Sequence, residues 1–202
     1  MIELTRRQWI VGAGAAVAGG LALNPARLAS ATALPTPWLV NIAKRELQKH
    51  GSAVRYHDRV AIADYTLPSR DPRFFFVDLQ NGTVSSHLVT HGRGSDPDHI
   101  GWLKYFSNVN GSLASSRGAY VTGDQYYGSN GLSLRLKGLD RDNYNAEPRA
   151  IVVHGAWYAN PKMIAEQGKL GRSEGCFAFP EAELASVLDR LGAGRLIFAD
   201  RL

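Results

Sequence analysis

The chain has 202 residues, of which 20% are charged, and a formal net charge of +5 at pH 7. Its 23 Lys and Arg residues are spread along the sequence, which excludes the continuous basic stretches typical of nucleic-acid binding. The mild positive excess would suit an acidic polymer, although ordinary solvated surface charge explains it equally simply. The length suffices for one domain with a sizeable core, and the sequence shows no internal repeat.

The N-terminus has the features of a secretory signal. Arg6 and Arg7 precede a weakly apolar stretch over residues 11–23, and Ala31-Thr32-Ala33 provides small residues for cleavage. We therefore predict a signal peptide at residues 1–33, with the paired arginines favouring the twin-arginine route. An uncleaved anchor is the weaker alternative, because a spanning helix needs about 20 strongly apolar residues. We expect an exported protein of the periplasm or cell wall, without stable membrane insertion after cleavage.

Residues 34–56 are expected to form an N-terminal helix and linker. Thr36-Pro37 is a helix start, followed by apolar residues at helical spacing, and His50-Gly51 should end the helix. The remainder, residues 57–202, contains several strand patterns joined by turns, including the Asn81-Gly82 hairpin signal. The predicted strands are 60–65, 73–79, 83–90, 118–123, 132–136, 149–153 and 195–199.

The segments between these strands complete a mainly β domain with few helices. Residues 91–118 are rich in glycine and serine, so we expect a long loop that lines a site. Residues 124–128 are expected to form a polar, aromatic turn, and residues 180–191 have the apolar spacing of a helix.

Cys176 is the single cysteine of the chain. Exported domains usually use cysteines in pairs, so a lone thiol is either a buried small hydrophobe or a reactive group. Ser173 and Gly175 flank it, and His154 lies 22 residues upstream at a predicted strand end. A neighbouring imidazole can activate a thiol, which is otherwise only a few per cent thiolate near neutral pH. We interpret Cys176 and His154 as a nucleophile and its base.

The flanking residues could shape the site. Gly175 lets backbone approach a substrate carbonyl, and the N–H groups of Gly175 and Cys176 are candidate oxyanion donors. Ser173 could hold the turn through a side-chain bond to backbone. The group that orients His154 is not visible in the sequence, and a backbone carbonyl is one possibility.

The His154-Gly155 and Ser173-Glu174-Gly175-Cys176 motifs resemble the signature of the YkuD-type L,D-transpeptidases, and most closely the YkuD_2-like branch. The resemblance covers roughly residues 57–200. It is supported by further matching segments at 76–79, 91–95, 118–123, 131–139 and 149–155.

The resemblance implies an exported wall enzyme with a β-sandwich or barrel-like catalytic domain and a few peripheral helices. In that family a cysteine attacks the carbonyl after the third residue of a peptidoglycan stem tetrapeptide and expels the terminal D-alanine. An amine then takes the acyl group, which forms L,D (3–3) cross-links or attaches another amine. Carried over, Cys176 is the nucleophile, His154 the general base, and Gly155, Ser173, Glu174 and Gly175 shape the site.

This chain departs from the family pattern at two positions. Glu174 stands where many members have histidine or asparagine, and Ala178 stands where many have arginine or asparagine. A carboxylate close to the thiol would raise the pKa of the thiol. Glu174 could instead point away, orient His154 or bind the amino group of the stem.

Other side chains could hold the substrate in place of the missing arginine. Arg172 and Arg93 are candidates, as is Arg135. His91 repeats the His-Gly pattern, although a histidine bonded to backbone at a strand end is the simpler interpretation. Tyr126 and Tyr127 could stack on sugar or peptide, or cover a core edge. The histidines lack metal-ligand spacing, so we expect no metal and no cofactor.

Two rival functions stay open at this point. The same Cys–His pair could hydrolyse the thioester with water, which would make the protein an L,D-carboxypeptidase. The domain could also be a non-catalytic wall-binding module. In each case the expected partner is peptidoglycan and its stem peptides, not nucleic acid, and we expect a monomer.

Overall fold

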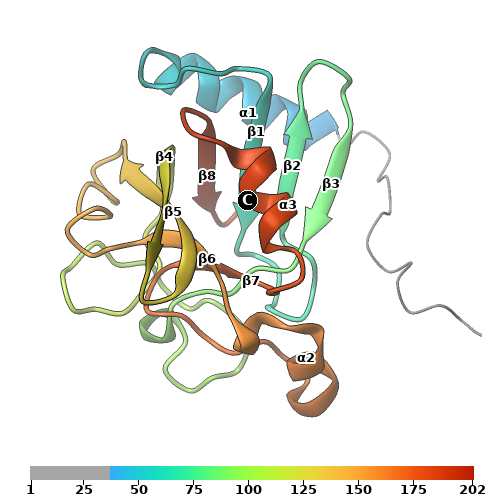
Figure 1. Ribbon diagram of the computed structural model, residues 1–202, viewed down its shortest axis with the longest axis vertical. Coiled ribbons are helices and arrows are strands. Elements are labelled where there is room, and N and C mark those ends of the chain that lie inside the picture. The colour runs from blue at the N-terminus through green and yellow to red at the C-terminus, as the bar shows by residue number, and fades with distance from the viewer. Residues whose placement is uncertain (1–36) are drawn as a thin grey trace, which may run out of the picture. The chain divides into compact units, whose positions relative to one another are not determined.

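The computed structural model describes residues 37–202, which belong to one compact unit (Figure 1). The predicted signal peptide at residues 1–33 lies outside the described residues and stays a prediction. Within residues 37–202, no helix has both the length and the apolar character that a bilayer crossing requires.

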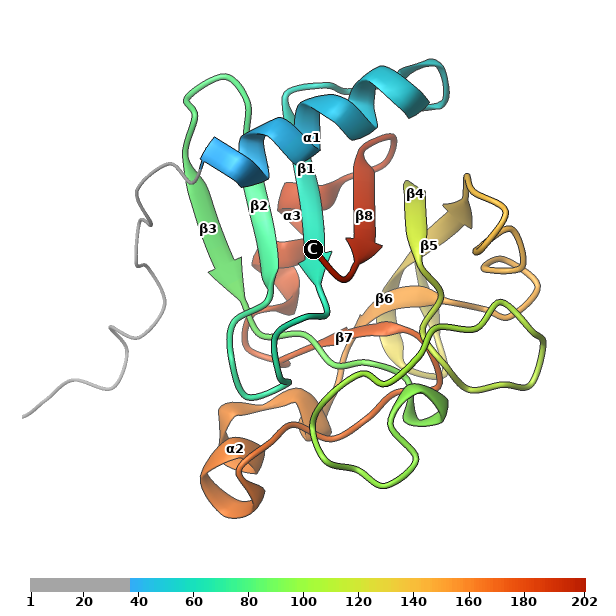
Figure 2. The same ribbon diagram turned by 180° about the vertical axis from the view of Figure 1, so that it is seen from behind.

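The domain is built on one eight-stranded sheet in the order β3-β2-β1-β8-β4-β5-β6-β7 (Figures 1 and 2). Strands β1 and β8 pair in parallel, as do β6 and β7, and the other neighbours are antiparallel. The prediction of a mainly β domain is confirmed. The strands are β1 (Arg59–Asp64), β2 (Phe74–Asp78), β3 (Val84–His87), β4 (Gly118–Gly128), β5 (Gly131–Gly138), β6 (Val152–Gly155), β7 (Phe177–Phe179) and β8 (Leu196–Asp200).

The sheet curls so that its two halves face each other across the main core. The ring of Phe74 in β2 lies 4.8 Å from that of Phe179 and 6.3 Å from that of Phe177, both in β7, although these strands are far apart in the sheet order. The helix α3 (Leu184–Leu191) adds Val187 and Leu188 to the same buried cluster. Apolar side chains from the two facing halves of the sheet therefore pack together in one core, as in a β-sandwich.

The N-terminal helix α1 (Pro37–His50) covers the opposite side of the sheet (Figure 2). Its buried residues Leu39 and Ala43 share a second apolar cluster with Val60 of β1 and Leu196 of β8. The helical spacing of its apolar residues predicted this element and its end at His50. The division into an N-terminal helix and linker at residues 34–56 and a domain at residues 57–202 stays a prediction.

Three of the predicted elements are corrected. The expected turn at 124–128 is wrong, because β4 continues to Gly128 through a bulge between Thr122 and Gln125. This end of the hairpin has polar or exposed residues on both faces, so it lacks the alternation that marks a half-buried strand. The strand expected from Arg149 begins at Val152, and the helix expected from Pro180 begins at Leu184.

One short α-helix and one short strand were not predicted at all. The helix α2 (Pro161–Gln167) has seven residues, and the strand β7 has three. Both lie between His154 and the C-terminal helix, so they determine where Cys176 sits relative to His154.

Candidate active site

Strand pairing brings Cys176 and His154 to neighbouring strands. β6 and β7 run in parallel, with His154 opposite Ala178 and Val153 opposite Phe177. Cys176 directly precedes β7, two residues before Ala178, so side-chain alternation assigns it to the same side of the sheet as His154. With strands about 4.8 Å apart and a rise of about 3.3 Å per residue, the two Cα atoms lie roughly 8 Å apart. The apolar residues between them, Val153 and Phe177, belong to the core on the other side.

His154 is held in a defined orientation by its own strand. Its side chain is buried, and Nδ1 lies 2.9 Å from the carbonyl oxygen of Gly155. Because a carbonyl can only accept, Nδ1 carries the hydrogen and Nε2 is left with a lone pair. Burial lowers the pKa of His154 below its ordinary value of 6.5, so the ring is neutral near pH 7. The carbonyl of Gly155 is thus the orienting group that the sequence left open.

Cys176 is present as a thiol. Its Sγ donates to the carbonyl oxygen of Ala150 at 3.5 Å, and the residue is partly exposed. Burial of the sulfur raises the pKa of Cys176, and the negative charge of Glu174 adds to that rise. His154 does not offset this rise, because its ring is itself uncharged and buried. Among the described residues, no hydrogen bond joins the two side chains. The pair rests as a neutral thiol beside a neutral imidazole.

The turn before Cys176 is closed by Ser173, as expected. The Ser173 hydroxyl donates to the carbonyl oxygen of Cys176 at 2.7 Å and accepts from the N–H of Gly175 at 3.2 Å. Gly175 has φ +117°, and a Cβ there would lie 2.7 Å from the carbonyl oxygen of Ala114. A side chain is excluded on both counts. Because Gly175 N–H is bonded to Ser173, the N–H of Cys176 is the remaining candidate oxyanion donor.

Backbone hydrogen bonds from a second loop, which begins at His91, support this turn. The N–H of Ser173 donates to the carbonyl oxygen of His91 at 2.9 Å, and the N–H of Arg93 donates to the carbonyl oxygen of Ser173 at 2.8 Å. The Gly92–Ser173 bridge is part of the same pairing. The loop that begins at His91 therefore positions the cysteine turn through backbone contacts.

His91 itself is fully buried, so its assignment as a substrate-binding residue is wrong. Its Nδ1 accepts from the buried guanidinium of Arg73 at 2.8 Å, and Nε2–H donates to Asp96 at 3.3 Å. Burial lowers the pKa of His91 to about 3, and the Arg73 charge contributes, so the ring is neutral. The alternative of a backbone-bonded histidine is also wrong, because both ring nitrogens bond to side chains.

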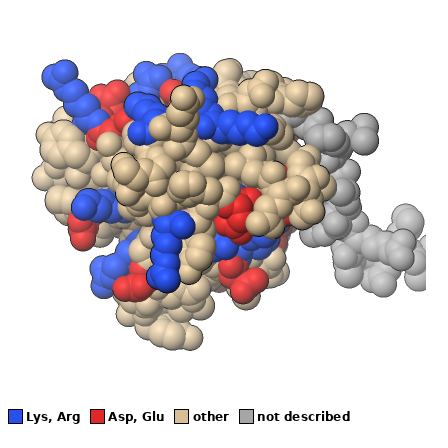
Figure 3. All heavy atoms as spheres, turned by 90° about the horizontal axis from the view of Figure 1, so that it is seen from above, with Lys and Arg blue, Asp and Glu red and all other residues tan. Residues whose placement is uncertain are grey.

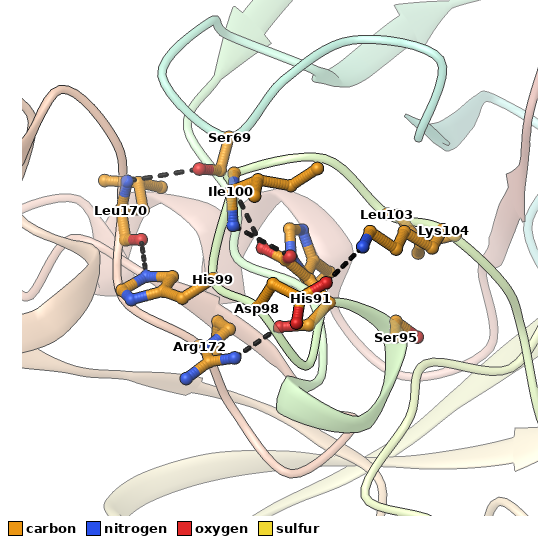
Figure 4. Close-up of polar contacts among 12 residues, drawn as sticks. Ser69, His91, Ser95, Asp98, His99, Ile100, Leu103, Lys104, Leu170 and Arg172 are labelled. Atoms are coloured by element: carbon orange, nitrogen blue, oxygen red, sulfur yellow. Dashed lines mark hydrogen bonds and ion pairs between the residues drawn. The ribbon is translucent and has the colours of Figure 1, made fainter.

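The two arginine candidates near this loop differ in availability. Arg93 forms an exposed ion pair with Glu174 at 2.7 Å, two residues before Cys176. The guanidinium of Arg172 is bonded to the carbonyl oxygens of Asp96 and Pro97. The close-up of the loop shows the side chain of Arg172 next to His99 (Figure 4). Arg93 and Glu174 thus present a charge pair at the surface beside the thiol, whereas Arg172 anchors backbone.

The two tyrosines lie at the far end of β4 and face opposite sides of the sheet. Tyr126 is opposite Ser133, which is opposite His154, so Tyr126 shares the side of His154 two strands away, roughly 10 Å. The guanidinium of Arg135 lies 4.1 Å from the centre of its ring. Tyr127 is 84% exposed and pairs with Leu132, on the other side. Of the two, Tyr126 is positioned to border the site.

Two residues near Cys176 were missed by the sequence interpretation. Arg149 lies in the turn before β6, and its charge partly opposes the rise in the pKa of Cys176, as does a backbone hydrogen bond from Val152. Tyr158 follows β6, and burial raises its pKa to about 12, with further contributions from Cys176 and Glu174. No local motif marks either residue, because their proximity to the thiol arises from the fold.

Charges elsewhere on the surface are mixed. On the face seen from above, Lys and Arg lie beside Asp and Glu (Figure 3). A hollow of about 600 Å³ beside α1 is lined by paired charges, including Lys49–Asp140 at 2.9 Å and Arg117–Asp200 at 2.8 Å. None of the predicted site residues lines it. In the part of the chain that the structure describes, no three His, Cys, Asp or Glu side chains form a cluster suited to a metal ion.

Comparison with known proteins gives one family match. The family described as the L,D-transpeptidase catalytic domain (YkuD_2) matches residues 37–199. A search of curated proteins found no match.

Solved structures with a similar fold include three proteins of low sequence identity. An L,D-transpeptidase from Mycobacterium smegmatis is 13% identical, with a TM-score of 0.42 over 71% of this chain and 58% of that one. The helical cell shape determining protein Pgp2 from Campylobacter jejuni is 14% identical, with a TM-score of 0.44 over 78% and 54%. An L,D-transpeptidase from Xylanimonas cellulosilytica is 16% identical, with a TM-score of 0.39 over 70% and 60%. The match spans less than two thirds of each of these chains.

Proposed function

Because the chain belongs to the family of L,D-transpeptidase catalytic domains, we propose that it is a cysteine acyltransferase that acts on peptidoglycan stem peptides. The observation that carries this proposal is the His154–Gly155 hydrogen bond, which leaves Nε2 free to accept a proton on the strand beside Cys176. A base must carry a lone pair near the group that it deprotonates, and the tautomer of His154 meets this requirement.

In the first half-reaction, Cys176 Sγ attacks the carbonyl after the third residue of the donor stem as its proton passes to His154 Nε2. The tetrahedral intermediate places a negative charge on the former carbonyl oxygen, for which the N–H of Cys176 is the proposed donor. The carbon–nitrogen bond to the terminal D-alanine then breaks, and His154 returns the proton to the leaving amine. The product is a thioester at Cys176.

In the second half-reaction, an acceptor amine attacks the thioester. His154 takes a proton from the amine, the carbon–sulfur bond breaks, and the thiol of Cys176 is restored. Water in place of the amine would give hydrolysis by the same two residues. Digestion of muropeptides separates these outcomes, since transfer gives 3–3 linked dimers and hydrolysis gives free tripeptides.

The site residues receive separate roles in this proposal. Ser173 and Gly175 hold the turn that presents the thiol, and Gly155 orients the base through its carbonyl. Arg93 and Glu174, which form an exposed ion pair, would meet the charged groups of the stem. Tyr126 borders the site on the side of β5.

A carbapenem tests the nucleophile directly, because its strained carbonyl acylates an activated thiol. We expect one inhibitor mass on the intact protein, no adduct on Cys176→Ala and much slower acylation of His154→Ala. His57→Ala is the matched control, since His57 is exposed and bonded only to backbone. An unmodified mass after long incubation would contradict acyl transfer and favour a non-catalytic wall-binding domain.

The cellular context is part of the same proposal. The predicted signal at residues 1–33 would export the protein, so that it acts as a monomer on the cell wall. Fractionation of cells that express the full chain tests this, with Arg6→Lys and Arg7→Lys together as the variant that should retain the protein inside.

A further inference from the structure

Arg149 is a half-buried cation whose contacts are all uncharged. Its guanidinium donates to the carbonyl oxygen of Ser107 at 2.7 Å, to the hydroxyl of Ser116 at 3.4 Å and to the carbonyl oxygen of Ala114. Within residues 37–202 it forms no ion pair with a carboxylate. Burial lowers the pKa of Arg149, so the unpaired charge carries a desolvation cost.

This guanidinium lies against the backbone that precedes the thiol. A Cβ placed on Gly175 would be 3.2 Å from Nη2 of Arg149. The next residue along the chain, Ala150, has φ +51° and accepts the Cys176 thiol through its carbonyl oxygen. The carbonyl oxygen of Ala150 therefore contacts the thiol itself, and the positive charge of Arg149 lies against Gly175, the residue before it.

The charge of Arg149 acts against the factors that raise the pKa of Cys176. Burial and Glu174 both raise the pKa of the thiol, which makes the thiolate costly to form. A backbone hydrogen bond from Val152 opposes them, and the charge of Arg149 adds to that opposition. Arg93 is less available for this role, because it is already paired with Glu174.

We infer that Arg149 is the counter-ion of the Cys176 thiolate, an inference that rests on the proposed role of Cys176 as nucleophile. As His154 removes the thiol proton, negative charge develops on sulfur beside a guanidinium that no carboxylate neutralises. The bonds to Ser107, Ala114 and Ser116 keep the guanidinium in place before and after that step. An opposite charge at short range stabilises the ionised form of a group.

The test compares thiolate formation in charge variants. The ultraviolet absorbance of the thiolate is followed against pH, as the difference between each protein and the same protein carrying Cys176→Ala. We expect Arg149→Gln to contain on the order of tenfold less thiolate than the wild type at a given pH below the thiol pKa. Arg141→Gln removes the same charge from an exposed position and should leave the titration unchanged.

A purely structural role predicts a different result. If Arg149 only anchors the loop, Arg149→Gln lowers the melting temperature while the thiol titrates as in the wild type, and that result overturns the inference. Should Arg149→Gln fail to fold, Arg149→Lys distinguishes the two roles. The lysine keeps the positive charge but cannot keep all three hydrogen bonds. A wild-type titration in Arg149→Lys supports the counter-ion, and tenfold less thiolate despite the retained charge overturns it.

The measurement is independent of acyl transfer. A thiol that titrates as expected but forms no carbapenem adduct would contradict the proposed function alone. A carbapenem adduct together with an unchanged titration in Arg149→Gln would contradict only the role of Arg149.

Discussion

The Nδ1 atom of His154 lies 2.9 Å from the carbonyl oxygen of Gly155, the residue that follows it in β6. The orienting partner of the proposed base is thus backbone, which carries no charge and cannot be removed by a side-chain substitution. A carboxylate in this place would raise the pKa of the imidazole, whereas here burial lowers it. The ring is therefore neutral and able to accept a proton near neutral pH.

This arrangement predicts the pH profile of acylation by a carbapenem. The pKa of His154 is lowered from 6.5 and that of Cys176 is raised from 9.0, so the thiol–imidazole pair is intact throughout that interval. We expect a second-order rate constant that is flat across it and declines only in more acidic solution, where the imidazole is protonated. The measurement is the acylation rate against pH by mass spectrometry. A rate that climbs tenfold per pH unit through the interval would mean that free thiolate reacts without a base.

Glu174 should oppose ionisation of the thiol. Glu174→Gln removes the negative charge that raises the pKa of Cys176, so we expect alkylation by iodoacetamide at neutral pH to accelerate about threefold. Arg93→Gln breaks the same ion pair but keeps the carboxylate, and should leave the rate unchanged or lower it. Equal acceleration in both variants would show that the ion pair hinders access to the thiol, and that the charge of Glu174 is not the cause.

Much of the fold follows from local patterns in the sequence. The apolar stripe of α1 and the alternation or apolar runs of β1 to β3 are signals within single segments, and each of these elements forms, although β3 ends at His87, three residues before the predicted end. The end of β4 and the strand β7 carry weaker signals. β7 has only three residues, and its strand character depends on pairing with β6. Such elements are specified by contacts between distant segments.

The candidate site divides in the same way. Cys176, His154 and Ser173 stand out because the residue types and their flanks are informative on their own. Arg149 does not stand out in the sequence, because its hydrogen-bond partners at residues 107, 114 and 116 belong to a loop that is distant along the chain. His91 was misassigned because nothing adjacent to it reveals that Arg73 and Asp96 enclose its ring.

The backbone at Gly175 should not tolerate a side chain. Gly175→Ala would force a Cβ to within 2.7 Å of the Ala114 carbonyl at φ +117°, so we expect a loss of about 2 kcal/mol or more in the free energy of unfolding. Gly131→Ala is the matched control, because Gly131 has φ +74° with no atom within 4 Å of the added Cβ. Its cost should be confined to the backbone conformation, about 1–2 kcal/mol. Urea unfolding of both variants checks the difference, and equal losses would mean that the loop at Ala114 moves freely.

Gly175→Ala should also slow acylation beyond what its stability explains. The added methyl group would push against the guanidinium of Arg149 as well as Ala114, and either movement displaces Cys176. The measurement is the carbapenem acylation rate at a temperature where both glycine variants are fully folded. A wild-type rate in Gly175→Ala would contradict the tight turn as a requirement for reaction.

The buried Arg73–His91–Asp96 array should make stability depend on pH. The folded protein keeps His91 unprotonated because its pKa is lowered to about 3, whereas a histidine in the unfolded chain titrates near 6.5. Between these values the unfolded chain binds more protons, so the free energy of unfolding falls as the pH falls, by at most about 1.4 kcal/mol per pH unit. Above pH 6.5 this contribution is fully present. His154 adds a dependence of the same sign.

Urea unfolding between pH 4 and 7 measures the slope. We expect His91→Gln to lose most of this pH dependence, because the glutamine binds no proton in the folded or the unfolded state. The variant should also be less stable than the wild type at every pH. His57→Gln should retain the wild-type slope, since His57 is exposed and bonded only to the carbonyl oxygens of Gly51 and Val54. An unchanged slope in His91→Gln would assign the acid sensitivity to other groups. Because the carbonyl of His91 accepts from Ser173, loss of the array should also loosen the turn that presents Cys176.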